Sequence, residues 1–336
     1  MKRMLFLINP RSGREQLRGK LMDILDMAVK AGYETEVYIT QCRDDARRAA
    51  RERGCGFDLV VCSGGDGTLN ETVSGLMDGA AGRCPACLGE PLPGEKSLPA
   101  AAGPMPGLPP LGYIPSGSTN DFAASLGLRK DKMKAAADVF EGADTAIDVG
   151  KFGDDRYFVY IAAFGAFTEV SYATPQDRKN LLGHQAYMIE AVKRLPTLKS
   201  YAMRFETEDR EIEGEFILGM VTNSLQVGGF KGLVGRNVAL DDGQFEVLLV
   251  RTPKTPGDLA SIASYFLMRE GDNACVYQFK ANRLLVTSQE PVDWTLDGEF
   301  GGAVSRVEIQ NLQKALLIRR RQGRKTSKNV LKNNTD

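Results

Sequence analysis

The sequence predicts an α/β region followed by an antiparallel β region, and three observations carry that prediction. Apolar strand-like segments alternate with helical segments up to about Asp144. Beyond Asp144, short strands follow one another with few helices between them. The third observation is the segment Phe57–Met77, in which a strand, a glycine turn and a helix are directly joined. We therefore expect a parallel sheet with right-handed crossovers, followed by an antiparallel β domain.

The first 144 residues contain the alternating elements. Apolar, partly β-branched runs predict strands at Met4–Ile8, Tyr33–Ile39, Phe57–Cys62 and Leu111–Ile114. Apolar residues at helical spacing predict helices at Arg14–Ala31, Asp44–Arg53, Leu69–Met77 and Phe122–Leu126. Residues 79–110 are rich in Pro, Gly and Ala and predict a flexible insertion. Its Cys84 and Cys87 could bind metal, carry redox chemistry or be two surface thiols.

Short strands dominate residues 145–318. They are expected at Ala146–Lys151, Tyr157–Ala163, Met203–Thr207, Ile212–Thr222, Gln244–Arg251, Asn282–Thr287, Asp293–Leu296, Val304–Ile309 and Ala315–Ile318. Two helices are expected among them, at Gln185–Leu195 and Asp258–Met268. The tail 319–336 is rich in Lys and Arg and is expected to be disordered. The predicted domains are therefore 1–144 and 145–318, followed by this tail.

Length and composition exclude several classes of protein. The chain has 336 residues, 43% of them hydrophobic, which is enough for two domains with substantial cores. Its formal net charge is +0, so no overall positive field attracts nucleic acid. Its 6 cysteines and single histidine, His184, do not make a zinc-site or disulfide-framework pattern. No stretch approaches the roughly 18 apolar residues of a membrane span, so we expect a cytoplasmic protein without an integral anchor.

The glycine turn after the Phe57–Cys62 strand is a candidate phosphate site. Backbone N–H groups and the positive end of the following helix would meet at this turn, and glycines allow phosphate oxygens to approach the backbone. Asp66 would repel phosphates unless a cation lay between them, which a divalent metal on a nucleotide would supply. The segment is not a P-loop, because no Gly-Lys-Ser/Thr follows and no lysine lies in the turn, and it does not match G-x-G-x-x-G either. On this evidence alone, a tight connection between strand and helix explains it equally well.

Further polar turns follow the other predicted parallel strands. They are Asn9–Gly13, Thr40 and the segment Pro115–Asp121, whose end is also explained as an ordinary helix N-cap. Ligands of parallel sheets bind beyond the carboxyl ends of the strands, so Asn9–Gly13, Thr40 and Gly64–Thr68 should face one crevice. Two acidic turns lie further on, at Asp241–Gly243 and Asp297–Glu299. Asp-Gly is a common hairpin turn, so each of these has a purely structural explanation as well.

Taken in order, these motifs resemble the bacterial diacylglycerol kinase family, which includes the sphingosine and ceramide kinase catalytic domains. The motifs are Asn9-Pro10-x-Ser12-Gly13, Gly64-Gly65-Asp66-Gly67-Thr68-Leu69-Asn70-Glu71, Pro115-x-Gly117-Ser118-x-Asn120-Asp121, Asp242-Gly243 and Asp297-Gly298-Glu299. The resemblance covers nearly the whole chain, apart from the insertion and the tail. It implies an N-terminal doubly wound α/β nucleotide-binding domain and a C-terminal antiparallel β-sandwich, with ATP and lipid meeting in the cleft. It also implies that the chain end returns towards the first domain.

The resemblance assigns roles to individual residues. ATP contacts would come from Asn9, Pro10, Arg11, Ser12, Gly13, Thr40, Gly64, Gly65, Asp66, Gly67, Thr68, Leu69, Asn70, Glu71, Ser118, Asn120 and Asp121. Asp66 would help to hold Mg²⁺·ATP, and Glu299, with Asp297 nearby, matches the general base. Asp242, with a backbone carbonyl such as that of Ala239, resembles a second, structural Mg²⁺ site. Gln244 departs from the family pattern there, since some relatives have an acid at that position.

The implied activity is transfer of phosphate from ATP to a lipid hydroxyl, most simply from ATP to diacylglycerol. A carboxylate base, Mg²⁺ and backbone dipoles are what that chemistry needs. The enzyme would visit the membrane surface through its basic tail or exposed apolar loops. Phosphatidylglycerol and sphingoid bases remain alternative acceptors, and the oligomeric state is open, a homodimer included. Two other functions share part of the pattern: an NAD kinase-like enzyme, and a nucleotide-binding regulatory protein without catalysis.

Overall fold

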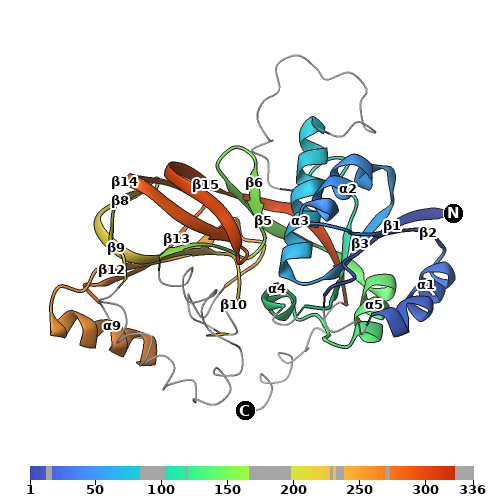
Figure 1. Cartoon of the computed structure of the whole chain (residues 1–336), viewed down its shortest axis with the longest axis horizontal. Helices are drawn as coiled ribbons and strands as arrows, with labels where there is room; N and C mark the ends of the chain where they lie inside the picture. The colour runs from blue at the N-terminus through green and yellow to red at the C-terminus, as the bar shows by residue number, and fades with distance from the viewer. Residues whose placement is uncertain are drawn as a thin grey trace, which may run out of the picture.

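In a computed structural model, two regions are joined by one continuous sheet (Figure 1). The structure describes residues 1–12, 17–83, 103–117, 120–165, 198–227, 230–231, 238–268 and 273–321. Within these residues, hydrogen bonds connect 13 strands into one sheet, in the order β13-β12-β9-β7-β14-β15-β4-β3-β1-β2, with β5, β6 and β8 paired off this path. None of the described helices is long and apolar enough to span a bilayer.

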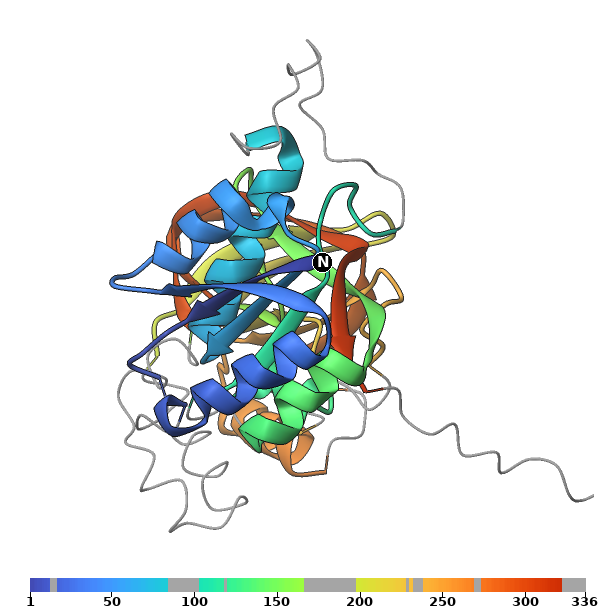
Figure 2. The same ribbon diagram turned by 90° about the vertical axis from the view of Figure 1, so that its right-hand side faces the viewer.

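The N-terminal region is a doubly wound α/β unit, as predicted. Its strands are β1 (Lys2–Ile8), β2 (Tyr33–Ile39), β3 (Leu59–Gly64) and β4 (Leu111–Pro115), and all pair in parallel. Its helical segments are η1 (Arg18–Lys20), α1 (Leu21–Lys30), α2 (Asp45–Arg53), η2 (Gly54–Gly56), α3 (Asp66–Asp78), η3 (Gly79–Arg83), α4 (Asp121–Ser125) and α5 (Lys132–Glu141). Figure 2 shows α1 and α5 on one side of the strands and α2 and α3 on the other.

The alternation of side chains along β1 explains these two helical layers. Met4, Phe6 and Ile8 pack in one buried cluster with side chains of α1 and α5. Leu5 and Leu7 belong to another cluster, which contains side chains of α2 and α3. Successive residues of a strand point to opposite faces, so an uninterrupted apolar run provides both faces of a sheet that is covered on both sides.

The C-terminal region is antiparallel, which confirms the predicted change from alternating strands and helices to successive strands. Its strands are β5 (Ala143–Phe152), β6 (Arg156–Phe158), β7 (Ile161–Gly165), β8 (Tyr201–Glu206), β9 (Glu211–Thr222), β10 (Gln226–Val227), β11 (Phe230–Lys231), β12 (Phe245–Arg251), β13 (Val276–Ala281), β14 (Arg283–Leu296) and β15 (Glu299–Arg320), with helix α9 (Pro256–Met268). An aromatic-rich cluster that includes Phe164, Phe205 and Trp294 fills the space between these strands. The two-layer sandwich and the exact domain limits remain predictions.

Several predicted elements were placed wrongly or missed. Helix α3 begins at Asp66 rather than Leu69, so the supposed loop residues form its first turn. The single strand predicted at Tyr157–Ala163 is two strands, β6 and β7. Conversely, β14 and β15 each replace a pair of shorter predicted strands, while α5 and β13 were not predicted. The helix expected at Gln185–Leu195, with His184, lies outside the described residues, as do Cys84, Cys87 and nearly all of the tail.

Strand β15 joins the two regions. Its first part pairs with β14, and residues from Ile309 onwards pair with β5. Its end then lies parallel to β4, with Ile318 opposite Leu111, so the chain does return to the N-terminal sheet. The end of the predicted flexible insertion is also ordered along β15, because the backbone N–H groups of Gly103 and Met105 donate to Gln313 and Ala315.

Helices α2 and α3 pack so closely at Gly75 that a side chain at this position should destabilise the protein. A Cβ on Gly75 would lie 2.2 Å from the carbonyl oxygen of Arg47 and 2.8 Å from Cβ of Ala50. Although alanine favours helix by roughly 0.5–1 kcal/mol, overpacking against another backbone costs about 1–3 kcal/mol. We therefore expect Gly75→Ala to lower the free energy of unfolding in urea. Gly19→Ala, where nothing lies within 4 Å of the added Cβ, is the matched control and should change it little.

Candidate active site

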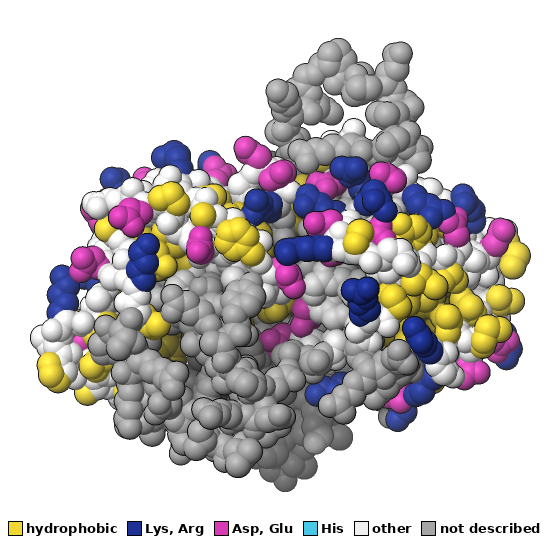
Figure 3. All heavy atoms as spheres, viewed as in Figure 1, with side chains coloured by type: hydrophobic (Ala, Val, Ile, Leu, Met, Phe, Trp, Pro, Cys, Tyr) yellow, Lys and Arg dark blue, Asp and Glu magenta, His cyan; other side chains and the backbone are white. Residues whose placement is uncertain are grey.

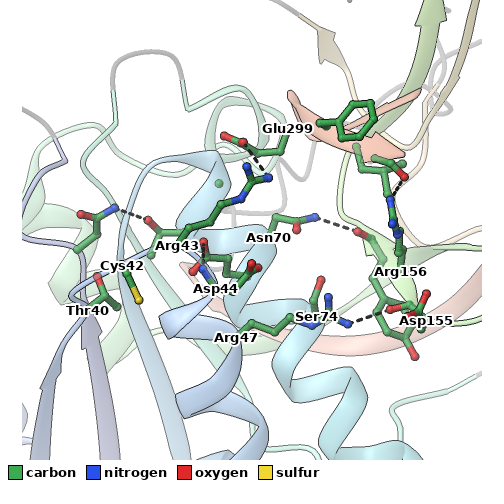
Figure 4. A pocket seen from close by; sticks show the side chains of 18 of the residues that line it. Thr40, Cys42, Arg43, Asp44, Arg47, Asn70, Ser74, Asp155, Arg156 and Glu299 are labelled. Atoms are coloured by element: carbon green, nitrogen blue, oxygen red, sulfur yellow. Dashed lines mark hydrogen bonds and ion pairs between the residues drawn. The ribbon is translucent and has the colours of Figure 1, made fainter. Parts of the chain in front are cut away.

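A cavity of about 560 Å³ opens where the carboxyl ends of the parallel strands face the β14–β15 turn (Figure 4). Side chains from the loop after β2, from α3 and from the β14–β15 turn line the same space. Of the predicted site residues, it brings together Asn9, Arg11, Thr40, Gly67, Thr68, Asn70, Glu71 and Glu299. The prediction that separate turns share one crevice is therefore confirmed for the turns after β1, β2 and β3.

The glycine turn after β3 is built by close approach of backbone to backbone. Strand β3 ends at Gly64, and Gly65 is the N-cap residue of α3. A Cβ on Gly117, in the turn after β4, would lie 2.5 Å from Cα of Gly65. The two turns therefore touch, which requires glycine at this position. The result is a 13-residue helix whose first turn lines the cavity at Gly67 and Thr68, a geometry suited to an anion.

Asn9 connects the turn after β1 to this helix. Its backbone N–H donates to the Ser63 carbonyl at 2.9 Å, and its side-chain amide donates to the Thr68 hydroxyl at 3.0 Å. Its side-chain oxygen accepts from the backbone N–H of Arg11 at 3.0 Å. Ser12 reaches the turn after β4 through a 2.7 Å hydrogen bond to Ser116. The polar residues of this motif therefore connect the turn after β1 to β3, to α3 and to the turn after β4.

Asn120 and Asp121 organise the turn after β4. Asn120 has a positive φ of 52°, and its side chain bonds both the N–H and the carbonyl of Gly117. The backbone N–H of Asp121 donates to Oδ2 of Asp66 at 3.1 Å. Oδ1 of Asp66 is buried and has no hydrogen-bond partner among the described residues. Burial raises the pKa of Asp66 to about 6, although the Asp121 N–H opposes the shift.

Asp297 is a buried positioning residue at the β14–β15 turn. It is 3% exposed, and its carboxylate accepts from the backbone N–H groups of Val159, Tyr160 and Ile161 at 2.7, 3.0 and 3.0 Å. A fourth donor is the side-chain amide of Asn70 in α3, at 2.7 Å. Burial raises the pKa of Asp297 to about 6, against the effect of these four donors. The predicted Asp-Gly hairpin turn is confirmed, and its aspartate also ties that hairpin to α3.

Glu299 follows this turn and faces the helix N-terminus. Its carboxylate is more than half exposed and lines the cavity. A Cβ on Gly67 would lie 3.4 Å from Oε1 of Glu299, so this carboxylate sits against the first turn of α3. Arg43, from the loop after β2, forms an ion pair with it at 3.5 Å (Figure 4). The Glu299 carboxylate and the first turn of α3 thus lie next to each other at the cavity.

Other predicted nucleotide contacts have structural roles here. Glu71 accepts from the backbone N–H groups of Asp44 and Ala46 at 2.9 and 3.2 Å and so caps the N-terminus of α2. The Thr40 hydroxyl bonds the Ile8 carbonyl at 3.3 Å, and Leu69 is fully buried in the core. Pro10 lies in the turn after β1, whereas Gly13 and Ser118 lie outside the described residues. Asp242 and Ala239 do not line the cavity.

Sequence reasoning did not single out three residues that line the cavity, Arg43, Arg47 and Arg156, or Tyr160, whose backbone N–H donates to Asp297. Arg47 is fixed by Asp78 at 2.9 Å and by the Asp155 carbonyl at 2.9 Å, and Arg156 donates to the Gly301 carbonyl. Burial, followed by the nearby carboxylates of Asp297, Asp66 and Asp121, raises the pKa of the Tyr160 hydroxyl well above its usual value. Arg43 lies three residues after Thr40, a predicted site residue, so the sequence could have identified it. No feature of the sequence identified Tyr160.

Comparisons with known proteins agree with this geometry. A family model described as the diacylglycerol kinase catalytic domain matches residues 3–152. The chain is 36% identical to a diacylglycerol kinase of Bacillus subtilis over 306 residues, which cover 90% of this chain and 91% of that protein. It is 34% identical over 311 residues to a diacylglycerol kinase of Staphylococcus aureus, with 90% and 87% covered.

A solved structure supports the fold over almost the full length. The crystal structure of a putative diacylglycerol kinase from Bacillus anthracis superposes with a TM-score of 0.72 at 23% identity and covers 95% of each chain. The sequence relatives exceed 30% identity over most of both chains, so they establish more than a shared fold. The chain belongs to the diacylglycerol kinase family and is a lipid kinase.

Proposed function

We propose that this protein transfers the γ-phosphoryl group of ATP, with Mg²⁺, to the hydroxyl of diacylglycerol and so forms phosphatidic acid. The observation that carries the proposal is the placement of Glu299 against Gly67, at the N-terminus of α3. A carboxylate beside an anion site can accept the proton of an attacking hydroxyl while the helix binds the phosphates. The names of the curated relatives support diacylglycerol as the acceptor.

The nucleotide phosphates would bind at the first turn of α3. Free N–H groups and the helix dipole favour negative charge there. Arg43 adds a positive side chain, which forms an exposed ion pair with Glu299 within the described part of the chain. Such pairs are worth about 0–1 kcal/mol, so phosphate oxygens can compete for this guanidinium at little cost. Arg43 would then leave Glu299 and bind the phosphates, so that the Glu299 carboxylate would be free to act as a base.

Asp66 fits a divalent cation. Oδ1 of Asp66 is buried without a partner among the residues described, and a buried unpaired carboxylate oxygen costs free energy unless a ligand compensates it. Mg²⁺ favours one or two carboxylates together with substrate phosphates. Bound there, Mg²⁺ would neutralise charge on the transferring phosphoryl group. No group of three or more metal-ligating side chains occurs in the described part of the chain, so the nucleotide would supply further ligands.

The proton transfer would depend on the hairpin that carries Glu299. The neighbouring Asp297 is held by four donors, which fixes the turn and therefore the start of β15. Glu299 would take the proton from the lipid hydroxyl as the oxygen attacks the γ-phosphorus. A general base placed in this way contributes typically about 10²–10⁴-fold.

The lipid acceptor requires contact with a bilayer. Figure 3 shows hydrophobic side chains gathered over α1 and β2, and the exposed members there are Met22, Val29, Val37 and Ile39. Exposed apolar groups of this kind can enter the interface region of a membrane. We include peripheral association with the cytoplasmic face of the membrane in the proposal. The same surface could instead support a homodimer, which a measurement of mass with and without vesicles would distinguish.

The direct test is transfer of labelled γ-phosphate from ATP and Mg²⁺ to lipids in mixed micelles, with NAD as a soluble control. Labelled phosphatidic acid from diacylglycerol is the expected product. Label on phosphatidylglycerol or a sphingoid base would keep the mechanism and change the substrate. Label on NAD alone, or ATP binding with no transfer, would overturn the proposal in favour of the two alternative functions.

Replacing the proposed base should remove turnover without unfolding the protein. We expect Glu299→Gln to lower kcat by about 10²–10⁴-fold, because the amide cannot accept the proton. Its effect on the KM for ATP should be small. Glu290→Gln is a matched control, since Glu290 also forms a 3.5 Å exposed ion pair, with Lys199, away from the cavity. Equal activity of the two variants would contradict the assignment of the base.

Replacing Arg43 should affect nucleotide binding first. We expect Arg43→Ala to raise the KM for ATP about 10-fold, which corresponds to roughly 1.4 kcal/mol. Arg43→Lys should recover part of the loss, because a charge remains without the two-pronged geometry of a guanidinium. Arg283→Ala, which breaks the exposed pair with Glu308, is the control. An unchanged KM in Arg43→Ala would remove this residue from the phosphate site.

Asp66 gives a pH-dependent prediction about stability. Its folded-state pKa of about 6 exceeds the ordinary 3.8, so the folded protein binds the proton more tightly than the unfolded chain. This group therefore lowers the free energy of unfolding as pH rises from about 4 to 6. Without metal, Asp66→Asn should be more stable than the natural protein at pH 7.5, by up to about 3 kcal/mol at 1.36 kcal/mol per pKa unit, but not at pH 4. Urea unfolding at both pH values, with exposed Asp23→Asn as control, measures the difference.

A further inference from the structure

We propose that Lys280 supplies, as a built-in cation, the positive charge that the Asp242 turn would otherwise take from a divalent metal. The resemblance led us to expect a structural Mg²⁺ at this turn. The surroundings of Asp242 instead fit an ammonium group. The proposal concerns folding and stability, and it stands independently of the substrate proposed above.

Two carboxylates converge on the Lys280 ammonium group. Nζ lies 2.9 Å from Oδ2 of Asp242 and 3.1 Å from Oε1 of Glu246. Glu246 is only 3% exposed, and neither of its carboxylate oxygens has another hydrogen-bond partner among the described residues. A buried carboxylate needs a positive partner, and Lys280 is the one that the fold provides.

The sheet register fixes this arrangement. Glu246 in β12 lies directly opposite Lys280 in β13, in an antiparallel pair. Directly opposed residues have Cβ atoms about 4.5–5.5 Å apart, within easy reach of an ion pair. The Lys280 side chain extends from there towards the turn that precedes β12, where it meets Asp242. The backbone register therefore places Lys280, whose side chain is 43% exposed, within reach of both carboxylates.

Several oxygen atoms of the Asp242 turn already accept hydrogen bonds. Oδ1 of Asp242 accepts from the backbone N–H of Gln244 at 3.0 Å. The Leu240 carbonyl accepts from the Asp148 N–H at 2.8 Å, and the Asp241 carbonyl accepts from the Gln313 side chain at 3.3 Å. Mg²⁺ demands near-octahedral geometry from oxygen ligands and waters. Among the described residues, the Asp242 carboxylate is already shared between the Lys280 ammonium group and the Gln244 N–H.

A second carboxylate, that of Asp148, holds the Asp242 turn through hydrogen bonds from backbone N–H groups. Asp148 is fully buried and accepts from the backbone N–H groups of Gly243 and Lys314 at 2.8 Å each. Lys314 has a positive φ of 56°, at the irregularity where β15 changes its register with β5. The turn is thus anchored to both β5 and β15 by protein groups. Its shape does not require a metal to close it.

The experiment measures thermal unfolding of the full chain after removal of metals, in the Asp66→Asn background so that the nucleotide site does not contribute. Without Lys280, two carboxylates are left uncompensated, so Lys280→Met should lower the Tm by about 3–8 °C. Millimolar Mg²⁺ or Ca²⁺ should restore part of this loss by occupying the vacated position. The Tm of the Asp66→Asn protein that retains Lys280 should not respond to EDTA or to added metal.

Two further variants test whether the metal response depends on Glu246 and whether loss of any exposed lysine lowers the Tm. Lys280→Met/Glu246→Gln should lose the metal response, because the buried negative charge is gone. Lys254→Met, which removes an exposed lysine paired with Glu215 at 3.5 Å, should change the Tm little. A Tm that falls with EDTA and recovers with Mg²⁺ while Lys280 is present would overturn the proposal, as would a Lys280→Met variant that neither loses stability nor gains a metal response.

Should Lys280→Met fail to fold, metal content decides the question. The Asp66→Asn protein that retains Lys280 should carry no tightly bound divalent ion after dialysis, by elemental analysis, and should bind none by calorimetry with Mg²⁺ at millimolar concentration. One bound ion per chain would overturn the proposal. Lys280→Arg, which keeps the charge, should fold and should remain indifferent to EDTA.

Discussion

The buried carboxylate of Asp297 is the interaction on which the arrangement of the site depends. It receives three consecutive backbone N–H groups from the segment between β6 and β7 and a fourth donor from Asn70 in α3. The β14–β15 hairpin, the antiparallel sheet and helix α3 are therefore joined at one side chain. Removing the carboxylate would leave several buried donors unpaired, each at a cost of about 1–3 kcal/mol. Because Glu299 follows two residues later, the contacts of Asp297 also fix its position.

The same junction explains why the sheet runs unbroken through both regions. Strand β15 starts at Glu299 beside the cavity and ends parallel to β4 at the edge of the α/β unit. Glu299 and the first turn of α3 are thus held by one hydrogen-bonded framework, and their separation does not rely on a flexible linker. Transfer chemistry benefits from such fixed placement, because misplacement of reacting groups by about 1 Å can cost about 10²-fold.

Local patterns of the sequence were sufficient to predict much of this fold. The apolar run of β1 and the glycine turn after β3 identified the parallel sheet and its ligand-binding edge, because both signals are confined to neighbouring residues. The joins within β14 and β15 could not be predicted, since exposed polar residues such as Ser288 and Glu290 interrupt the apolar pattern while pairing continues around them. The structural use of Glu71 as a cap was equally hidden, because its partners, Asp44 and Ala46, are more than 20 residues away.

The treatment of buried carboxylates separates structural acids from functional ones. Asp297 and Asp148 are neutralised by backbone N–H groups, Asp78 by Arg47, and Glu246 by Lys280. Asp66 differs, because one of its oxygens is buried with neither a hydrogen bond nor a cation among the described residues. Its other oxygen is held by the backbone N–H of Asp121, so the side chain is oriented but not satisfied. Glu246 also accepts no hydrogen bond, but Lys280 compensates its charge, so among these acids Asp66 is the exception. That exception lies beside the N-terminus of α3, where a nucleotide with its metal would supply the missing positive charge.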